Sequence, residues 1–150
     1  MPKGARRLPD RCVELIAAAE AVIHAGDFFA TSALEELEAI CPVHAVHGNV
    51  DEESLRRSLP AELEIGIGRW TIAITHDAGP AQGRLTRLRL RFPSADAVIF
   101  GHSHLPLHEE EDEFQIFNPG SPTERRRAPQ PSMGLLNYGE AGLVFEHVWL

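Results

Sequence analysis

The sequence predicts an α/β fold in which two β-sheets pack face to face and helices cover their outer surfaces. Two observations favour this class. In the first two thirds of the chain, short apolar runs alternate with stretches of helical periodicity, as they do in βα units. In the last third, strand-like runs follow one another with only turns between them, which is typical of antiparallel strands. The sequence has no internal repeat, low-complexity stretch or linker, so a single domain over residues 1–150 is expected.

Four helices are expected from apolar side chains that recur at helical spacing. Ser32 and Glu35 stand in capping-box register for the second of them, and Pro42 ends it. The segment 82–92 suits either a helix or a strand, and we choose a helix because it then forms the crossover between two parallel strands. Its arginines are interpreted as a solvent-exposed face: Arg84, Arg87, Arg89 and Arg91. The expected helices span residues 9–21, 33–40, 52–58 and 82–92.

The expected strands are short runs bounded by glycine, proline or acidic turns. The strongest signal is a hairpin in which isoleucines alternate with other residues on both sides of a turn at residues 66–69. The acidic residues 109–113 are interpreted as the tip of a second hairpin. Outside the first hairpin, the predicted strands are residues 21–23, 43–46, 97–100, 106–109, 114–117, 134–137 and 143–149.

Composition and charge exclude several classes of function. A chain with 43% hydrophobic and 24% charged residues fits a compact soluble domain, and a net charge of −8 argues against general nucleic-acid binding. No apolar run is long enough to cross a bilayer and no signal-peptide pattern is present, so a membrane is not an expected partner. Cys12 and Cys41 are interpreted as small buried side chains without a disulfide, which predicts a cytoplasmic location.

Residues 101–104, with the sequence GHSH, directly follow the apolar run of residues 97–100. Extended backbone points alternate side chains to the same face, so His102 and His104 are expected to lie side by side. Two neighbouring imidazoles at the end of a buried strand indicate a functional loop. On its own the motif is weak, since one histidine bound to a backbone carbonyl and one in solvent would explain it equally well.

The same local pattern occurs at four places, where a short apolar strand ends and a residue with a metal-binding side chain follows. The candidate metal ligands at these strand ends are Asp27, Asn49, His76, His102 and His104. Ligands of open α/β sheets bind at the carboxyl ends of strands, so these side chains are expected to converge. Imidazole, carboxylate and amide donors without thiolate suit Mn²⁺, Fe, Zn²⁺, Ni²⁺ or Co²⁺. A carboxylate can bridge two cations, and paired metals are a common arrangement for phosphoryl transfer.

The series HAGD, GNVDE, TH, GHSH and NPGS, in this order and at these intervals, closely resembles the calcineurin-like metallophosphoesterases. It is most similar to their small YfcE/MJ0936/Vps29-like phosphodiesterase subgroup, and the resemblance covers nearly the whole chain. It implies a four-layer α-β-β-α sandwich of two mixed sheets with a dinuclear metal site at the sheet edges. In that site Asp27 would bridge the two metals and His104 would bind one of them. The ligands of the other metal would be completed by Asn49, His76 and His102.

The resemblance implies a metal-dependent phosphodiesterase or phosphatase that activates water for attack on a phosphate ester of a small molecule. Mn²⁺ is the first expected cofactor, and Ni²⁺, Co²⁺, Fe or Zn²⁺ are alternatives. Larger relatives carry a histidine after the asparagine of GN, where it protonates the leaving group. Val50 occupies this position here, so poor leaving groups are expected to react slowly. The alternative function is a Vps29-like protein-interaction scaffold with little or no catalysis.

The family pattern begins with a strand that ends in Asp-x-His and supplies further ligands of the metal shared with His104. This sequence has no such motif, as expected for a misplaced start codon or a truncated N-terminus. One tight metal site and impaired activity would follow, because the second metal would keep only Asp27 and His104. We also expect the strand edge left open to pair with another copy in a homo-oligomer, or the start of the chain to rearrange.

Other side chains receive weaker interpretations. Arg125, in the run of three arginines after NPGS, is a candidate for binding the substrate, because a planar guanidinium matches phosphate oxygens. A solvated loop is the competing interpretation. Asp51 and Glu52 are expected to cap the helix that follows them. His24 and His47 are interpreted as packed histidines rather than ligands.

Overall fold

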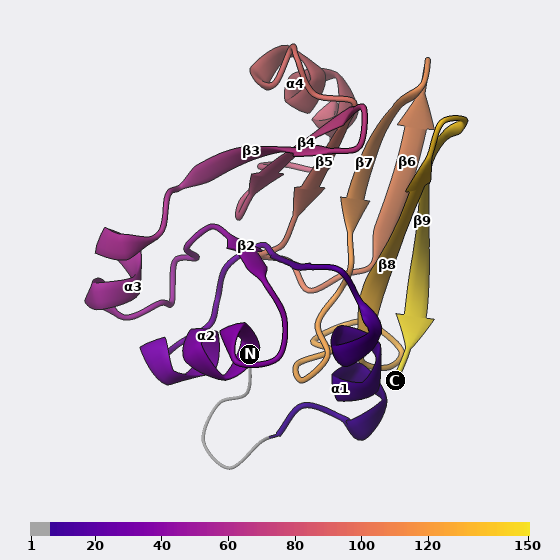
Figure 1. Ribbon diagram of the computed structural model, residues 1–150. Helices are drawn as coiled ribbons and strands as arrows, with labels where there is room; N and C mark the ends of the chain where they lie inside the picture. The colour runs from indigo at the N-terminus through magenta and orange to yellow at the C-terminus, as the bar shows by residue number, and fades with distance from the viewer. Residues whose placement is uncertain (1–6) are drawn as a thin grey trace.

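The computed structural model describes residues 7–150, which form four layers (Figure 1). In chain order the elements are α1 (Asp10–Ala18), β1 (Val22–His24), α2 (Thr31–Glu38), β2 (Val43–Ala45), α3 (Glu53–Ser58), β3 (Glu62–Ile67), β4 (Trp70–Thr75), α4 (Arg84–Arg91), β5 (Ala97–Phe100), β6 (Leu107–Glu111), β7 (Phe114–Asn118), β8 (Ser132–Gly139) and β9 (Gly142–Trp149). The outer layers are α4 on one side and α1 with α2 on the other. Between them lie a five-stranded sheet and a layer of two strand pairs.

The five-stranded sheet has the order β3-β4-β5-β7-β6. β4, β5 and β7 run parallel, whereas β3 and β6 pair antiparallel at the two edges. Every residue of β5 is buried, as expected for a parallel strand that is covered on both faces. Thr75 pairs with Phe100, and the N–H of Gly101 donates to the carbonyl of His76 at 3.0 Å. The segments after β4 and β5 therefore leave the sheet at the same edge.

The third layer consists of a parallel pair, β1 with β2, and an antiparallel hairpin, β8 with β9. The register places His24 opposite Ala45, so β1 and β2 also end together. Within residues 7–150 the two pairs are not hydrogen-bonded to each other. A cavity of about 990 Å³, lined by residues of α1, β1 and β8, extends to Asp27 and His104. It connects the apolar interior of this layer with the loops at the strand ends.

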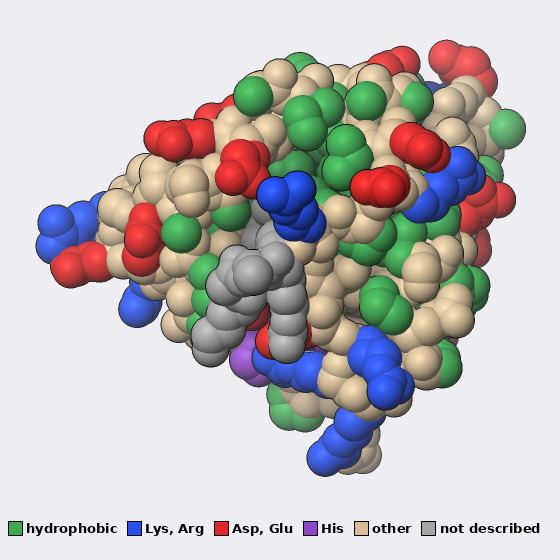
Figure 2. Space-filling model, turned by 90° about the horizontal axis from the view of Figure 1, so that it is seen from below, with side chains coloured by type: hydrophobic (Ala, Val, Ile, Leu, Met, Phe, Trp, Pro, Cys, Tyr) green, Lys and Arg blue, Asp and Glu red, His purple; other side chains and the backbone are tan. Residues whose placement is uncertain are grey.

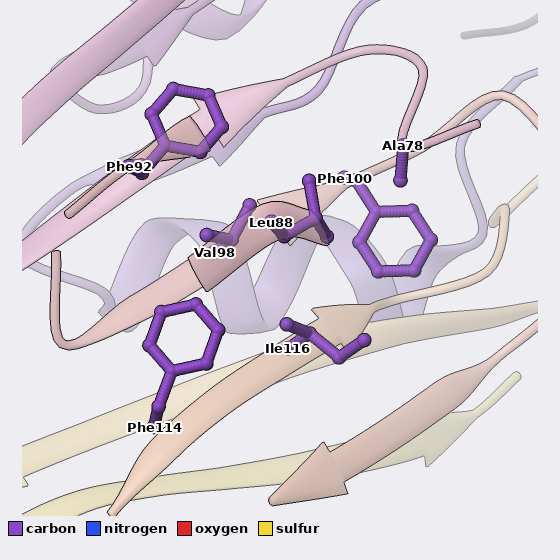
Figure 3. Close-up of a cluster of buried hydrophobic side chains, with 8 residues drawn as sticks. Ala78, Leu88, Phe92, Val98, Phe100, Phe114 and Ile116 are labelled. Carbon is purple, nitrogen blue, oxygen red and sulfur yellow. The ribbon is translucent and has the colours of Figure 1, made fainter. Parts of the chain in front are cut away.

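Three clusters of buried apolar side chains fill the interfaces between the layers. α4 packs on the five-stranded sheet through a cluster that includes Leu88, Phe92, Val98, Phe100, Phe114 and Ile116 (Figure 3). The two strand layers meet through Ile72, Ala97, Ile99, Phe117, Leu143 and Phe145. α1 and α2 pack on the third layer through a cluster that includes Cys12, Ile16, Leu37 and Ala45. Successive residues of β5 face opposite clusters, and the predicted four-layer arrangement is confirmed.

Most predicted elements are present, with ends shifted by no more than three residues. α1 ends at Ala18 because Ala19 already has extended backbone, with φ −86° and ψ 155°. The ambiguous segment 82–92 forms α4, as predicted. In the first hairpin Ile67 pairs with Trp70, which leaves a two-residue turn whose first residue, Gly68, has a φ of 59°. Such turns require positive φ, so glycine suits this position.

The capping box predicted from Ser32 and Glu35 is wrong. α2 begins at Thr31, and its N-cap residue, Ala30, makes no capping hydrogen bond with its side chain. Instead, the backbone N–H of Thr31 donates to the carboxylate of Glu52 at 2.7 Å, and its hydroxyl donates to the same oxygen. A distant partner therefore replaces the local cap. Glu52 in turn does not cap α3 with its side chain, contrary to prediction.

The arginines of α4 do not form a purely solvated face, contrary to prediction. Arg87 donates to the carbonyl oxygens of Ala78 at 2.7 Å and Pro80 at 2.6 Å. The guanidinium carbon of Arg84 lies 5.1 Å from the centroid of the Phe100 ring. The helix thereby holds the loop that follows β4 as well as the sheet beneath it.

In the part of the chain that the structure describes, no helix combines the length and apolar character needed to cross a membrane. Cys12 and Cys41 are buried free thiols, as predicted. The Cys41 sulfur lies 3.4 Å from the carbonyl oxygen of Ala19. Both cysteines belong to the cluster beneath α1 and α2, where they act as small core side chains.

Candidate metal and active site

The five candidate ligands lie after the carboxyl ends of four strands, as predicted. Asp27 follows β1, Asn49 follows β2 and His76 follows β4; His102 and His104 follow β5. β1 with β2 and β4 with β5 are parallel neighbours, so the ends of each pair meet at one sheet edge. Contacts between Asp27 and His76, and between Asn49 and His102, join the two edges into one site.

Four of these side chains form a compact group of nitrogen and oxygen atoms. Asn49 Oδ1 lies 2.8 Å from His76 Nε2 and 3.1 Å from His102 Nδ1, and the two ring nitrogens are 3.2 Å apart. Asp27 Oδ1 lies 3.4 Å from His76 Nε2. The other carboxylate oxygen, Asp27 Oδ2, lies 3.8 Å from His104 Nε2. Asp27 therefore stands between a group of three donors and His104.

Backbone carbonyls fix the orientation of two of the histidine rings. His76 Nδ1 lies 2.7 Å from the carbonyl oxygen of Ala25, and His104 Nδ1 lies 3.1 Å from that of Glu124. Since a carbonyl only accepts, each Nδ1 carries a proton and each neutral ring keeps a lone pair on Nε2. At His76 this lone pair faces the oxygen of Asn49, which is also an acceptor. Two acceptors at 2.8 Å are favourable only with a proton or a cation between them.

The chemistry of this group fits a divalent transition metal. Donors about 2.0–2.2 Å from one metal stand roughly 3 Å from each other, close to the separations of 2.8–3.4 Å found here. Imidazole, amide and carboxylate donors suit the metals predicted from the sequence. Among residues 7–150, no group made up only of three or more His, Cys, Asp and Glu side chains is arranged to hold a metal ion. The predicted ligand set therefore includes the amide oxygen of Asn49 as well as carboxylate and imidazole donors.

Comparisons with known proteins identify the family. Residues 4–141 match the calcineurin-like phosphoesterase superfamily domain. The chain belongs to this superfamily. A probable metallophosphoesterase from Methanothermobacter thermautotrophicus is 31% identical over 142 residues, which cover 93% of this chain and 82% of the relative. Phosphodiesterase MJ0936 from Methanocaldococcus jannaschii is 30% identical over 113 residues, which cover 67% of this chain and 66% of that protein.

Solved structures share the calcineurin-like phosphoesterase fold. Wild-type Vps29 from Entamoeba histolytica, complexed with Zn²⁺, aligns with a TM-score of 0.77 at 21% identity. The alignment covers 99% of this chain and 93% of Vps29. The family resemblance inferred from the ordered motifs is confirmed, and membership in the superfamily implies dependence on a divalent metal.

One buried carboxylate joins two of the loops that carry candidate ligands in this phosphoesterase-superfamily chain. Asp51 accepts the backbone N–H groups of Asp27 at 3.1 Å, Phe29 at 2.7 Å and Gly48 at 2.7 Å. The prediction that Asp51 caps α3 is wrong, since no side chain caps that helix. Because its donors come from the segments after β1 and after β2, Asp51 fixes the loops of Asp27 and Asn49 relative to each other.

The loops that carry the candidate ligands adopt uncommon backbone conformations. Of the seven described non-glycine residues with positive φ, four lie in these loops: Asp27, Phe29, His102 and His104. Such conformations cost energy in residues with a Cβ and persist where surrounding contacts hold them. Gly48 is required by a close approach, because a Cβ there would lie 2.1 Å from Asp27 Oδ1. Strained backbone and close packing together position the candidate ligands.

The environment of Asp27 keeps its carboxyl group ionised. Burial by itself would raise the pKa of this group, but interactions with His104, His76 and the backbone N–H of Val50 outweigh burial and lower the pKa. The Val50 N–H lies 3.4 Å from Asp27 Oδ1. Val50 therefore contributes to the site through its backbone, while its side chain has no proton to transfer. A buried anion between nitrogen donors is suited to binding a cation.

His24 is a packed histidine, as predicted. Its ring stacks on Phe28 with centroids 3.7 Å apart, and its Nδ1 accepts the N–H of Gly26 at 3.2 Å. Burial lowers the pKa of His24 to about 3, so the ring is neutral near pH 7. His47 Nδ1 lies 3.4 Å from the carbonyl oxygen of Gly48. Both histidines thus contact the backbone of the loops that carry the candidate ligands.

Asn118 and Arg125 make hydrogen bonds that were not predicted from the sequence. Asn118 was assigned no role, yet it is fully buried and donates to the carbonyl of Gly101 at 2.9 Å and the hydroxyl of Ser103 at 3.1 Å. It therefore supports the loop that carries His102 and His104. Only its place in the motif could have signalled this. The guanidinium of Arg125 donates to carbonyl oxygens at residues 128 and 129 of its own loop, at 3.1 Å and 3.3 Å.

Proposed function

We propose that the chain is a divalent-metal-dependent phosphoesterase that hydrolyses phosphodiesters or phosphomonoesters of small molecules. The observation that carries this proposal is the convergence of carboxylate, amide and imidazole donors from four strand ends, with Asp27 between them. A divalent metal bound there would supply Lewis-acid activation of water and of the phosphoryl group. Superfamily membership supports the same class of reaction.

Hydrogen bonds within the protein already give the histidines of the candidate site orientations that suit metal binding. His76 and His104 are held through Nδ1, so each directs Nε2 inward without rearrangement. Asp27 supplies the negative charge. Val50 has no group that could protonate a leaving group. We therefore expect the fastest hydrolysis for aryl esters, whose leaving group departs without a proton.

The proposal includes one tight metal site. The group of Asp27, Asn49, His76 and His102 offers four donors, whereas the predicted ligands on the other side are Asp27 and His104 alone. Mn²⁺ is the first candidate, and Ni²⁺, Co²⁺, Fe and Zn²⁺ have similar ligand preferences.

The test combines metal titration with hydrolysis of bis(p-nitrophenyl) phosphate. Calorimetry with Mn²⁺ or Zn²⁺ should find one tight site that His76→Ala weakens. Asp27→Asn should lower metal-dependent hydrolysis by at least about a hundredfold, because a neutral amide cannot replace the central carboxylate. Asp112→Asn, an equivalent change in the exposed turn between β6 and β7, serves as the control. Two equally tight sites, or hydrolysis that survives Asp27→Asn, would contradict the assignment.

The second candidate function is a protein-interaction scaffold. The likeness to Vps29, with a TM-score of 0.77 over 99% of this chain, is compatible with it. Absence of hydrolysis by folded protein with Mn²⁺, Ni²⁺, Co²⁺ and Zn²⁺ would favour the scaffold over the enzyme.

A further inference from the structure

The segment 121–127 lies against the loop that carries His102 and His104. His104 Nδ1 lies 3.1 Å from the carbonyl oxygen of Glu124. The hydroxyl of Ser121 accepts the backbone N–H of Glu124 at 3.0 Å, which closes a tight turn at the start of the segment. Arg126 donates from Nη1 to the carbonyl oxygen of His102 at 2.8 Å. Two hydrogen bonds thus attach this segment to the two histidines of the GHSH motif.

Two neighbouring arginines of this segment have different surroundings. Arg125 donates to carbonyls of its own loop, so its guanidinium is used within the segment. Arg126 instead reaches the backbone of His102, whose ring nitrogen Nδ1 is 3.1 Å from Asn49 Oδ1 in the candidate metal site. On the face seen in Figure 2, histidine and basic side chains lie together at one place on the surface. Arg126 is therefore the arginine that the structure brings to the site.

The chemistry of Arg126 suits an anionic ligand. A guanidinium has five N–H donors, and the bond to His102 uses one of them, so the exposed remainder can form a paired contact with phosphate oxygens. The backbone of Arg126 has a φ of 46°, an uncommon conformation for a residue with a Cβ. The chain as a whole has a net charge of −8, so an anionic substrate needs a local positive charge near the reacting group.

We propose that Arg126 binds an anionic oxygen of the substrate's phosphate group beside the candidate metal site. This inference rests on the proposed function, because it places the phosphate ester next to His102. It assigns the substrate contact to Arg126 rather than to Arg125. It also gives Arg126 a role in affinity for phosphate, with the metal ligands left in position.

The test measures binding of inorganic phosphate to metal-loaded protein by calorimetry at fixed ionic strength. Arg126→Gln should weaken phosphate binding about tenfold to a hundredfold, because a hydrogen bond between two charged groups is lost. The glutamine amide ends two bonds short of Arg126 Nη1, so metal affinity is measured in the same variant. It should stay within about twofold, because no candidate metal ligand is changed. Arg127→Gln removes an equal charge from the same segment and controls for long-range electrostatics. Arg125→Gln tests the competing assignment.

Three results would overturn the proposal. Phosphate affinity could be unchanged in Arg126→Gln, or it could fall only in parallel with metal affinity, which would make Arg126 a positioning residue for His102. Arg125→Gln or Arg127→Gln could cause the same loss. A wild-type protein that binds phosphate through Arg126 but hydrolyses no ester would refute the proposed activity and leave this inference standing, so the two failures are distinguishable.

Discussion

The core beneath α4 is buried throughout, whereas the candidate metal site at the strand ends is buried at Asp27, His76 and His104 but exposed at Asn49. The core consists of apolar side chains from regular elements, such as Leu88, Phe100 and Ile116 (Figure 3). The site consists of polar side chains from loops, several with positive φ, and each is held by a specific hydrogen bond. Stability is thus concentrated in one region and chemistry in the other, and a substitution should affect them separately.

The two regions should tolerate different kinds of amino-acid substitution. In the core, free energy depends on the volume and apolar area of side chains, which neighbours of similar size can partly replace. Beside the candidate site, the carboxylate of Asp51 accepts three backbone N–H groups at once, and no other side chain reproduces that set. The core should respond to lost volume, and the site to lost hydrogen bonds.

The largest effect on stability is expected for Leu88→Ala. Leu88 is fully buried between α4 and the sheet, so its truncation leaves a cavity and should lower the free energy of unfolding by about 2–5 kcal/mol. Leu90→Ala is the matched control on the same helix, since Leu90 is 77% exposed and should change stability by less than about 0.5 kcal/mol. Urea unfolding measures both. Metal affinity of folded Leu88→Ala should equal that of wild type, and a parallel loss of metal binding would show that the two regions are coupled.

A smaller loss of stability, with a change in the site, is expected for Asp51→Asn. The amide cannot accept the N–H groups of Asp27, Phe29 and Gly48 with both terminal atoms, so at least one buried donor loses its partner. We expect a cost of about 1–3 kcal/mol and weaker metal binding, because the loops of Asp27 and Asn49 are no longer joined. Glu52→Gln, next in sequence, changes a carboxylate that contacts Thr31 outside the site and should leave metal affinity unchanged. Equal metal affinity in the two variants would argue against this role of Asp51.

A third prediction concerns the pH dependence of stability, which accumulates gradually over several pH units and involves His24. The pKa of His24 is lowered to about 3 in the folded protein, whereas an unfolded histidine titrates near 6.5. Between these values the unfolded state binds a proton that the folded state does not, so stability falls as pH decreases from about 6.5 towards 3. The contribution approaches about 1.4 kcal/mol per pH unit. Unfolding of metal-free protein at several pH values should show a shallower slope for His24→Asn than for wild type. Identical slopes would mean that His24 is protonated in the fold.

Much of the fold could be predicted because its elements follow local rules. The buried run of residues 97–100, the hairpin around Gly68 and the alternation of helical and strand patterns each have a direct sequence signal. The capping box at Ser32 failed because Glu52, far away in sequence, offers Thr31 a better partner. The arginines of α4 were misjudged because their partners are backbone carbonyls, which carry no mark in the sequence.

The candidate site, like the fold, could be predicted only in part. Its five predicted ligands come together because each follows a strand, and parallel neighbouring strands end at a common edge. The residues that support them could not be predicted in this way. Asp51 and Asn118 act on backbone groups of loops that only the folded chain brings close. Arg126 and Arg125 are chemically identical in the sequence, and only their hydrogen bonds distinguish them.

Gly48 makes the chain intolerant of substitution at a position that carries no functional group. A Cβ there would lie 2.1 Å from Asp27 Oδ1 and 2.4 Å from Asp27 N. Every other amino acid has a Cβ, so no choice of side chain relieves the contact. In saturation mutagenesis, position 48 should therefore accept glycine alone, while position 90 accepts most residues. Glycine is required at such a position because no space is left for a Cβ beside a candidate metal ligand. The functional group itself is the carboxylate of Asp27.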